Sequence, residues 1–219
     1  MQSGSVALFE RGSKNEHAPA LADALAEEPV DSPTPVDVLE ELTESAEAVT
    51  ARIDHAKKLF EATAEGRLLD RNVLTGELGS LLDLLQRLDK ADRYDEELRL
   101  ARALHGLLVL AFRWLELVRS LRTVLGAARR ARDVAGEAWA LHELGTLHLA
   151  AGHATRAIDH LEAALALEEQ VGNALDRCTT RHNLDSARAT SHSACSGDGC
   201  CAPPRSSASL PFSQEGVPR

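Results

Sequence analysis

The residues with the greatest capacity for chemistry are histidines in the second half of the chain. His142 and Glu143 invite comparison with the helical zinc motif, in which two histidines four residues apart bind the metal from one face. Here the next histidine is His148, six residues on, so the two rings lie on different sides of a helix. His153 and His160 are seven apart and share a face, but no cysteine or carboxylate completes a ligand set. We therefore expect no metal site, and packing or solvated roles for these histidines.

Cysteines and glycines provide no stronger candidate for catalysis or cofactor binding. The segment Arg11-Gly12-Ser13-Lys14 lacks the glycine-rich lead-in and the strand-to-helix context of a phosphate-binding loop. No arrangement of serine, histidine and acid positions a nucleophile. We expect no cofactor and no enzyme activity, and an inert C-terminal tail with adventitious metal binding or oxidation as the alternative. Metal-capable groups cluster in that tail without the C-x2-C spacing of a structural site: His192, Cys195, Cys200 and Cys201.

The charge of the chain is concentrated near its N-terminus. The sequence has 34 acidic and 24 basic residues, a net charge of −10, and the stretch 16–47 holds ten acids with no lysine or arginine. The remainder balances 24 acids with 24 bases, so no basic excess is available to displace counterions from phosphates. We expect no nucleic-acid partner. The acidic stretch is interpreted as a solvated linker, with a docking arm for a basic partner as the alternative.

Composition favours an all-α protein. Hydrophobic residues make up 44% of the chain but aromatic residues only 3%, and alanine and leucine dominate, which suits helices that pack through aliphatic layers. A sheet protein is expected to hold more valine, isoleucine, threonine and tyrosine. The longest apolar run, Leu107 to Phe112, is far short of the roughly 20 residues of a membrane helix. With no secretory pattern visible, we expect a cytoplasmic protein with reduced cysteines.

Residue patterns divide the chain into four parts. Residues 1–33 are expected to be a disordered acidic segment, with a transient helix from Pro19 to Glu28. Residues 34–66 are expected to form an amphipathic helix that begins at Thr34-Pro35. Residues 67–190 hold further helical patterns, the last ending at about Ala189. Residues 191–219 are rich in serine, glycine, proline and cysteine and are expected to be a disordered tail.

The amphipathic helix of residues 34–66 carries an apolar seam with alternating spacings of three and four, typical of packing against another helix. We expect its partner to lie within the molecule. A homo-dimer formed through the Leu39 to Phe60 helix is the alternative. The seam consists of Leu39, Leu42, Ala46, Val49, Ile53, Ala56 and Phe60.

The stretch 138–171 predicts two amphipathic helices joined by a turn at Gly152, where a left-handed residue would end the first helix. The small residues Gly145, Ala157 and Ala164 are expected to let the two helix backbones approach closely where they cross. This helical hairpin resembles a tetratricopeptide repeat. His148 stands where the family usually has tyrosine, and Glu169 where it often has proline. The positions that carry the resemblance are Leu141, Leu144-Gly145, Gly152, Ala157, Leu161 and Ala164-Leu165.

The leucines of this hairpin recur at intervals of forty residues from about 56 to 190. Leu104 and Leu184 flank Leu144 at that interval, and Leu121 and Leu81 precede Leu161. The pattern is similar to the repeat arrays of bacterial signalling ATPases and transcriptional regulators. It implies antiparallel helical hairpins stacked as a short α-solenoid, with three hairpins and a partial fourth.

The tetratricopeptide resemblance implies a scaffold that binds a partner peptide or protein in a groove lined by the first helix of each pair. We expect a groove suited to an acidic peptide or a C-terminal carboxylate. The alternatives are a regulatory or sensor fragment working with a signalling ATPase or transcriptional regulator, and a truncated product without function. For Trp139 the alternatives are a core position and a ligand platform. The expected groove residues are Arg99, Arg102, Trp139, His142, Thr146, Leu149 and His182.

Overall fold

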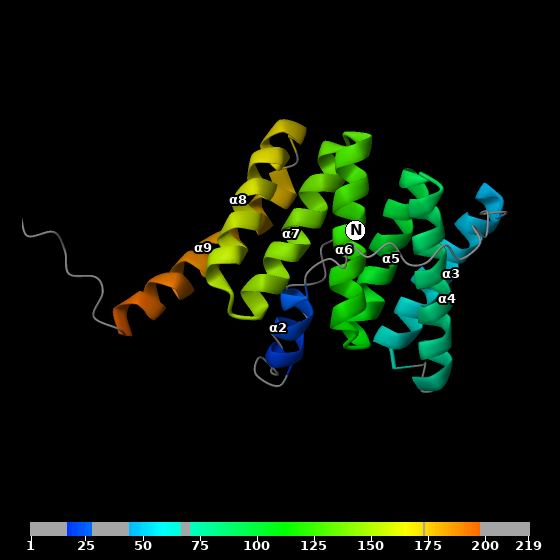
Figure 1. The fold of residues 1–219 in the computed structure, drawn as a ribbon, viewed down its shortest axis with the longest axis horizontal. Coiled ribbons are helices and arrows are strands. Elements are labelled where there is room, and N and C mark those ends of the chain that lie inside the picture. The colour runs from blue at the N-terminus through cyan, green and yellow to red at the C-terminus, as the bar shows by residue number, and fades with distance from the viewer. Residues whose placement is uncertain (1–16, 28–43, 67–70, 173, 198–219) are drawn as a thin grey trace, which may run out of the picture.

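The computed structural model describes residues 17–27, 44–66, 71–172 and 174–197. Within these ranges the regular secondary structure is entirely helical, so the all-α prediction is confirmed (Figure 1). The helices are α2 (Ala18–Ala26), α3 (Ala46–Ala64), α4 (Arg71–Lys90), α5 (Tyr94–Leu110), α6 (Trp114–Ala131), α7 (Val134–Ala150), α8 (Ala154–Val171) and α9 (Ala174–Gly197).

The turns between α4 and α9 recur every twenty residues. Each contains one residue with positive φ. In the four turns between α4 and α8, the residue after it donates its backbone N–H to the carbonyl five positions earlier, as His153 does to His148 at 2.9 Å. Gly152, at φ +79°, adopts this conformation without the steric penalty that a Cβ would bring. Two such units make forty residues, which explains the spacing of the leucines. The positive-φ residues are Asp92, Phe112, Arg132, Gly152 and Gly172.

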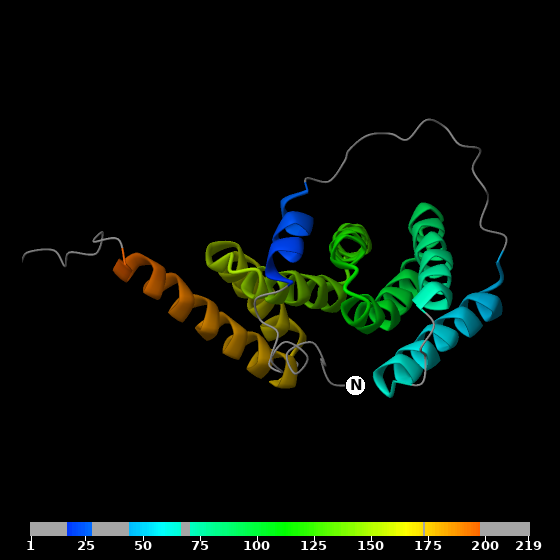
Figure 2. The same ribbon diagram turned by 90° about the horizontal axis from the view of Figure 1, so that it is seen from below.

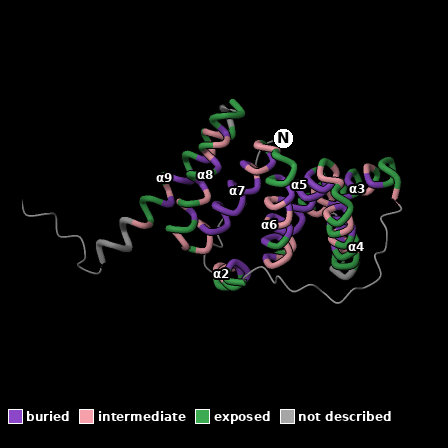
Figure 3. The backbone as a smooth tube through the Cα atoms, turned by 45° about the horizontal axis from the view of Figure 1, so that its top comes forward, coloured by how far each residue is buried: buried purple, intermediate pink, exposed green. Residues whose placement is uncertain are grey.

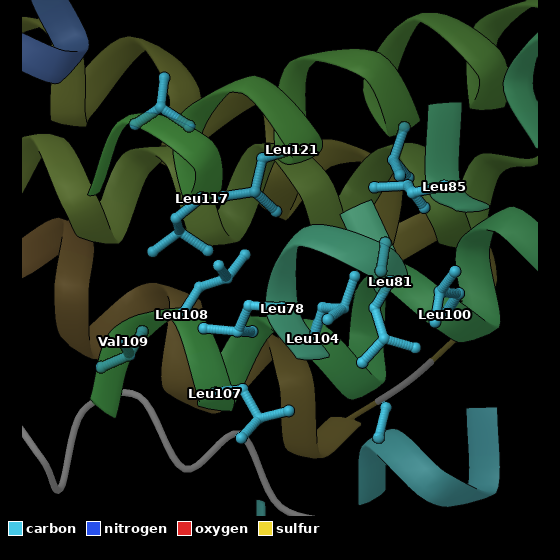
Figure 4. Close-up of a cluster of buried hydrophobic side chains, with 14 of the residues drawn as sticks. Leu78, Leu81, Leu85, Leu100, Leu104, Leu107, Leu108, Val109, Leu117 and Leu121 are labelled. Carbon is cyan, nitrogen blue, oxygen red and sulfur yellow. The ribbon is translucent and has the colours of Figure 1, made fainter. Parts of the chain in front are cut away.

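Leucines from α4, α5 and α6 form the main apolar core (Figure 4). Leu81, Leu104 and Leu117 are completely buried there, and α3 adds Val49 and Ile53. Helix α3 packs mainly against α5 rather than against α4, which follows it in the chain. The larger part of the molecule is therefore held together by aliphatic side chains from six helices, since α2 and α7 join the same core.

Helix α7 is the most enclosed element, covered by α6, α8 and α9 (Figure 3). Between Ala138 and His148 every residue except Trp139 is buried. A Cβ on Gly145 would lie 2.7 Å from Leu161 Cγ, so the absence of a side chain lets α7 and α8 approach closely. The sequence-based expectation of a close crossing at this glycine is confirmed.

The N-terminal part departs from expectation. Residues 1–33 were expected to be disordered, but α2 is a helix whose Leu21, Ala24 and Leu25 are buried against the rest of the molecule. Pro19 in its first turn is compatible with a helix start because the missing N–H has no helical partner there. The helix expected from Pro19 to Glu28 is therefore present as α2, but it is docked rather than transient, because its three spaced apolar side chains pack on distant helices.

Boundaries at the other predicted segments also shift. Helix α3 begins at Ala46, after Ser45 accepts the backbone N–H of Ala48 at 3.2 Å. The expected start at Thr34-Pro35, with Leu39 and Leu42 of the seam, lies outside the described residues. At the other end α9 continues to Gly197, so the tail expected from residue 191 begins as helix. None of the described helices is long and apolar enough to cross a membrane.

The described part of the seam faces inward. Val49, Ile53 and Ala56 are completely buried, and Phe60 packs against the same core. A ring edge of Phe60 occupies the space where a Cβ on Gly106 of α5 would lie, at 2.5 Å. The expectation of an intramolecular helical partner is thus confirmed, with α5 as that partner.

Candidate protein-interaction surface

The residues expected to line a groove separate into exposed, half-buried and buried groups. Arg99 and Arg102 are exposed on α5, and His182 is exposed on α9. Trp139 is half-buried on α7. Leu149 is also half-buried, and it packs against the small apolar cluster between α8 and α9. His142 and Thr146 are buried within the protein.

His142 lies in a buried hydrogen-bonded chain between α7, α8 and α9. The Thr180 hydroxyl donates to Glu168 Oε1 at 2.7 Å, so it must accept from His142 Nδ1, also at 2.7 Å. Burial lowers the pKa of His142 and raises the pKa of Glu168, because both lose the hydration that favours their charged forms. This series of hydrogen bonds is a structural link between helices rather than a docking surface.

Thr146 extends the link one turn further along α7. Its hydroxyl donates to the carbonyl of His142 at 2.9 Å and accepts from Asn183 Nδ2 at 3.0 Å. The exposed fractions of His142 and Thr146 are only 5% and 6%. The expectation that these two residues line an accessible groove is therefore wrong, because α9 covers that face of α7.

A second face of α7, toward α5, brings together three of the predicted residues. The Arg102 guanidinium lies 5.2 Å from the centroid of the Trp139 ring, within range of a cation–π interaction. Arg99 lies one helical turn before Arg102 and therefore shares its face. We call Arg99, Arg102 and Trp139 the cationic–aromatic surface. It offers two exposed guanidinium groups beside an apolar ring.

A buried ion pair lies beside Trp139. His105 Nε2 on α5 lies 3.2 Å from Glu143 Oε2 on α7, and their side chains are only 10% and 4% exposed. Burial lowers the pKa of His105, but the Glu143 carboxylate more than offsets this, so the net pKa is raised. The edge of Trp139 meets the His105 ring at a centroid distance of 6.1 Å. The pair therefore fixes the two helices where the surface forms.

Asp133 fixes the register of α7 against α5. Its Oδ1 accepts the backbone N–H groups of Ala135 and Gly136, both at 3.0 Å, which caps the start of α7. The hydroxyl of Tyr94, at the start of α5, donates to the other oxygen of Asp133 at 2.9 Å. One side chain thus caps a helix and ties it to its neighbour. Apart from the acid that precedes α7, no feature of the sequence predicted this bond.

Three histidines meet at the end of α7 and the start of α8. The ring centroid of His148 lies 5.7 Å from that of His153 and 5.1 Å from that of His160. Burial lowers the pKa of His148 to about 4, and the neighbouring histidines and arginines act in the same direction. Across the described residues, no group of three or more His, Cys, Asp or Glu side chains is arranged to hold a metal ion. Sequence spacing paired His153 with His160 but missed His148, which comes from the preceding helix.

The separation of His142 from His148 was predicted correctly. His142 bonds to Thr180 of α9, whereas His148 lies among the histidines of the α7–α8 turn. The cysteine-rich segment cannot be placed in this way, because the side chains beyond residue 191 lie outside the description.

The surface is thus defined by contacts within one chain. Its charges are Arg99 and Arg102, its aromatic ring is Trp139, and the buried His105–Glu143 pair lies beside that ring. The chain has no match among protein-family models, curated proteins or solved structures.

Proposed function

We propose that the chain is a non-catalytic protein-interaction module whose cationic–aromatic surface binds an acidic peptide segment of a partner protein. The observation that carries this proposal is the position of Arg102 over Trp139, with Arg99 one turn away on the same face. Arginine and tryptophan are the residue types that contribute most at protein interfaces. Here they are adjacent and accessible.

The chemistry of the surface favours carboxylates attached to an apolar chain. A guanidinium group can bind a carboxylate through two parallel hydrogen bonds, and the Trp139 ring can cover the adjoining methylene groups. The chain as a whole has a net charge of −10, which opposes binding to the continuous negative charge of a nucleic acid. An isolated acidic segment of a protein meets less of this repulsion, because salt screens charges more than about 10 Å away.

The packing of α7 and α8 supports the tetratricopeptide character that we propose for this module. Gly145 lies against Leu161 at the close crossing, and Gly152 forms the left-handed turn, both at positions that carry the resemblance. Ala157 and Ala164 are completely buried on the same side of α8. We further propose a stacked array of such hairpins and a cytoplasmic setting.

The proposal is tested by affinity capture from a lysate of the source cell. The bait is compared with an Arg99→Ala and Arg102→Ala double variant. A matched control, Arg132→Ala with Arg181→Ala, removes two exposed arginines from the turn after α6 and from α9 instead. Circular dichroism checks that all three proteins are equally helical. We expect the Arg99 and Arg102 variant to lose at least about tenfold of the captured partner, equivalent to about 1.4 kcal/mol, while the control keeps it.

Retention of the partner by the Arg99 and Arg102 variant would contradict the proposal. So would equal loss in both variants, because net charge rather than this surface would then control binding. Removal of Trp139 provides a further check. Trp139→Ala should weaken capture, whereas Trp139→Phe should retain much of it, since phenylalanine keeps an aromatic face for Arg102.

A further inference from the structure

Helix α2 is docked on helices that lie far along the sequence. The bond between Arg119 and Glu27, for example, joins residues that are 92 positions apart. It lies beside α6 and the adjoining part of α7 (Figures 1 and 2). Leu21 and Leu25 are 1% exposed and Ala24 is 5% exposed, so one face of α2 is fully covered. Ala20, Asp23 and Ala26 on the opposite face are exposed. The surface therefore accepts a single amphipathic helix through three side chains.

Two arginines of α6 bind the C-terminal end of α2. Arg122 Nη2 donates to the carbonyl of Leu25 at 3.0 Å, and Arg122 Nη1 donates to the carbonyl of Glu27. Arg119 Nη2 forms an ion pair with Glu27 Oε2 at 2.8 Å. The last carbonyls of a helix have no partners within it and carry the negative end of its dipole. The two arginines thus bind the free carbonyl groups at a helix end, which every helix has, and one acidic side chain.

The N-terminal end of α2 is held by aromatic contacts. The His17 ring stacks on Phe112 at a centroid distance of 4.1 Å and an interplanar angle of 27°, and lies 6.3 Å from the Trp114 ring. Phe112 occupies the left-handed turn between α5 and α6, where the residue remains 55% exposed. Both ends of α2 are thus recognised by side chains of the same two-helix region.

Helix α2 is too short to be stable by itself. It has nine residues, and its N-cap residue His17 makes no side-chain capping bond. Isolated helices of fewer than about 12–15 residues are marginal in water. The helix is therefore held by its docking surface and by its covalent attachment, which supplies a high effective concentration. A ligand of this kind can be replaced by a competitor that makes the same contacts.

We propose that the α6–α7 face is a helix-docking site, that α2 occupies it as an intramolecular ligand, and that a partner helix of the same pattern can replace α2. The pattern follows from the contacts: leucine at the first and fifth positions, alanine at the fourth and an acid at the seventh, as in Leu21, Leu25, Ala24 and Glu27. Occupation by α2 makes the site autoinhibited. This site is separate from the cationic–aromatic surface, and neither proposal depends on the other.

The test uses the full chain and a labelled peptide with the sequence of residues 17–28. In a Leu21→Ser and Leu25→Ser variant, α2 loses its two covered leucines and the site is released. We expect the peptide to bind this variant, by fluorescence anisotropy, at least tenfold more tightly than it binds the natural chain. A control with Ala20→Ser and Ala26→Ser, both on the exposed face, should behave as the natural chain does. Adding Arg122→Ala to the released variant should weaken peptide binding about tenfold.

Three results would overturn the proposal. The peptide could fail to bind the released variant although circular dichroism shows its other helices intact. It could bind the natural and released chains equally, which would place it on another surface. The two serines could instead unfold the whole chain cooperatively, which would make α2 a core element that cannot be exchanged.

The oligomeric state separates a partner helix from a second copy of this chain. Light scattering of the natural chain should show a monomer, with α2 docked within its own molecule. A dimer that disappears in the released variant would show that α2 is exchanged between copies, and would replace the partner helix with a second copy.

Discussion

The two sides of α7 differ in the kinds of side-chain contact that they make. Toward α5 and α6, the contact is part of a core of leucines, among them Leu104, Leu144 and Leu147. Toward α8 and α9, the apolar cluster is small, with Ala157, Leu161, Leu184 and Ala187 as its buried members. On this second side, hydrogen bonds between buried polar groups accompany the apolar contacts.

This difference shows how each side obtains its stability and specificity. Aliphatic packing is non-directional and its stabilisation depends on the apolar volume that is buried. The leucine core should therefore tolerate substitution by apolar side chains of similar volume. The bonds among His142, Thr180 and Glu168 each require one donor and one acceptor at a fixed place. The α9 side therefore fixes the register of its helices through polar groups, at the risk of a large penalty when one partner is lost.

Leucine truncation should give the largest difference between the two sides. Leu104→Ala should lower the free energy of unfolding by about 3–5 kcal/mol, because Leu104 is completely buried among other large side chains that cannot close the cavity. Leu184→Ala should cost only about 2 kcal/mol, since it is 3% exposed and its neighbours include small alanines. Urea denaturation followed by circular dichroism measures both. Equal costs would remove the distinction between the two sides.

The close crossing of α7 and α8 provides the next test. Gly145→Ala should destabilise the chain by about 1–3 kcal/mol, because the new Cβ would lie 2.7 Å from Leu161 Cγ and 3.3 Å from His160 Cβ. Gly79→Ala in α4 is the matched control. Its Cβ would meet nothing within 4 Å, so alanine should stabilise the helix by about 0.5–1 kcal/mol. A gain in stability at Gly145 as well would show that the two helices do not cross closely there.

Removing one hydroxyl tests the polar link directly. Thr180→Val keeps the shape but leaves His142 Nδ1 and Glu168 Oε1 without this partner, so it should cost about 1–3 kcal/mol. Ser186→Ala, which removes a solvent-accessible hydroxyl bonded to the His182 carbonyl, should change stability by less than about 0.5 kcal/mol. Thermal unfolding of the two variants side by side decides the matter. Indistinguishable melting temperatures would show that the link contributes nothing.

The smallest effects concern pH, where two buried groups, Glu97 of α5 and His148 of α7, should change the stability in opposite directions. Burial raises the pKa of Glu97 on α5 to about 7 from its ordinary value of 4.5, with the charge of Asp89 as a second cause, so the folded chain binds more protons in that range. Its contribution to stability therefore falls as pH rises from 4.5 to about 7. The pKa of His148 on α7 is lowered to about 4 from 6.5, so its contribution rises with pH between those values.

Melting temperatures across this pH range separate the two groups. Relative to the natural chain, Glu97→Gln should gain stability as pH increases, because glutamine cannot ionise. His148→Gln should gain stability as pH decreases. The buried histidine stays neutral while the unfolded chain binds a proton, which lowers the stability of the natural chain, whereas glutamine does not titrate. Parallel curves for all three proteins would show that neither group is held in a shifted state by its surroundings.

The helical elements could be predicted because their signals are local. The turn at Gly152, the close crossing at Gly145 and the buried seam of α3 each follow from spacing and residue size over a few turns. The docking of α2 could not be predicted, since it depends on Arg119 and Arg122 far along the chain.

The candidate site was predicted only where one helix face remains uncovered. Arg99 and Arg102 were correctly expected at the surface. His142 and Thr146 were not, because a helical projection shows which residues share a face but not which helix will cover that face. Leu184, forty residues after Leu144, indicated a further helix in the array, but not that this helix would cover His142 and Thr146 through Thr180 and Asn183.

A titration of Trp139 fluorescence tests the proposed binding surface most directly. The chain has two tryptophans, so a Trp114→Phe background makes the emission report on Trp139 alone. An oligoglutamate peptide should change that emission in a saturable, salt-sensitive way, and Arg99→Ala with Arg102→Ala should abolish the change. An emission that stays constant, or that changes equally without the two arginines, would contradict a peptide-binding role for this surface.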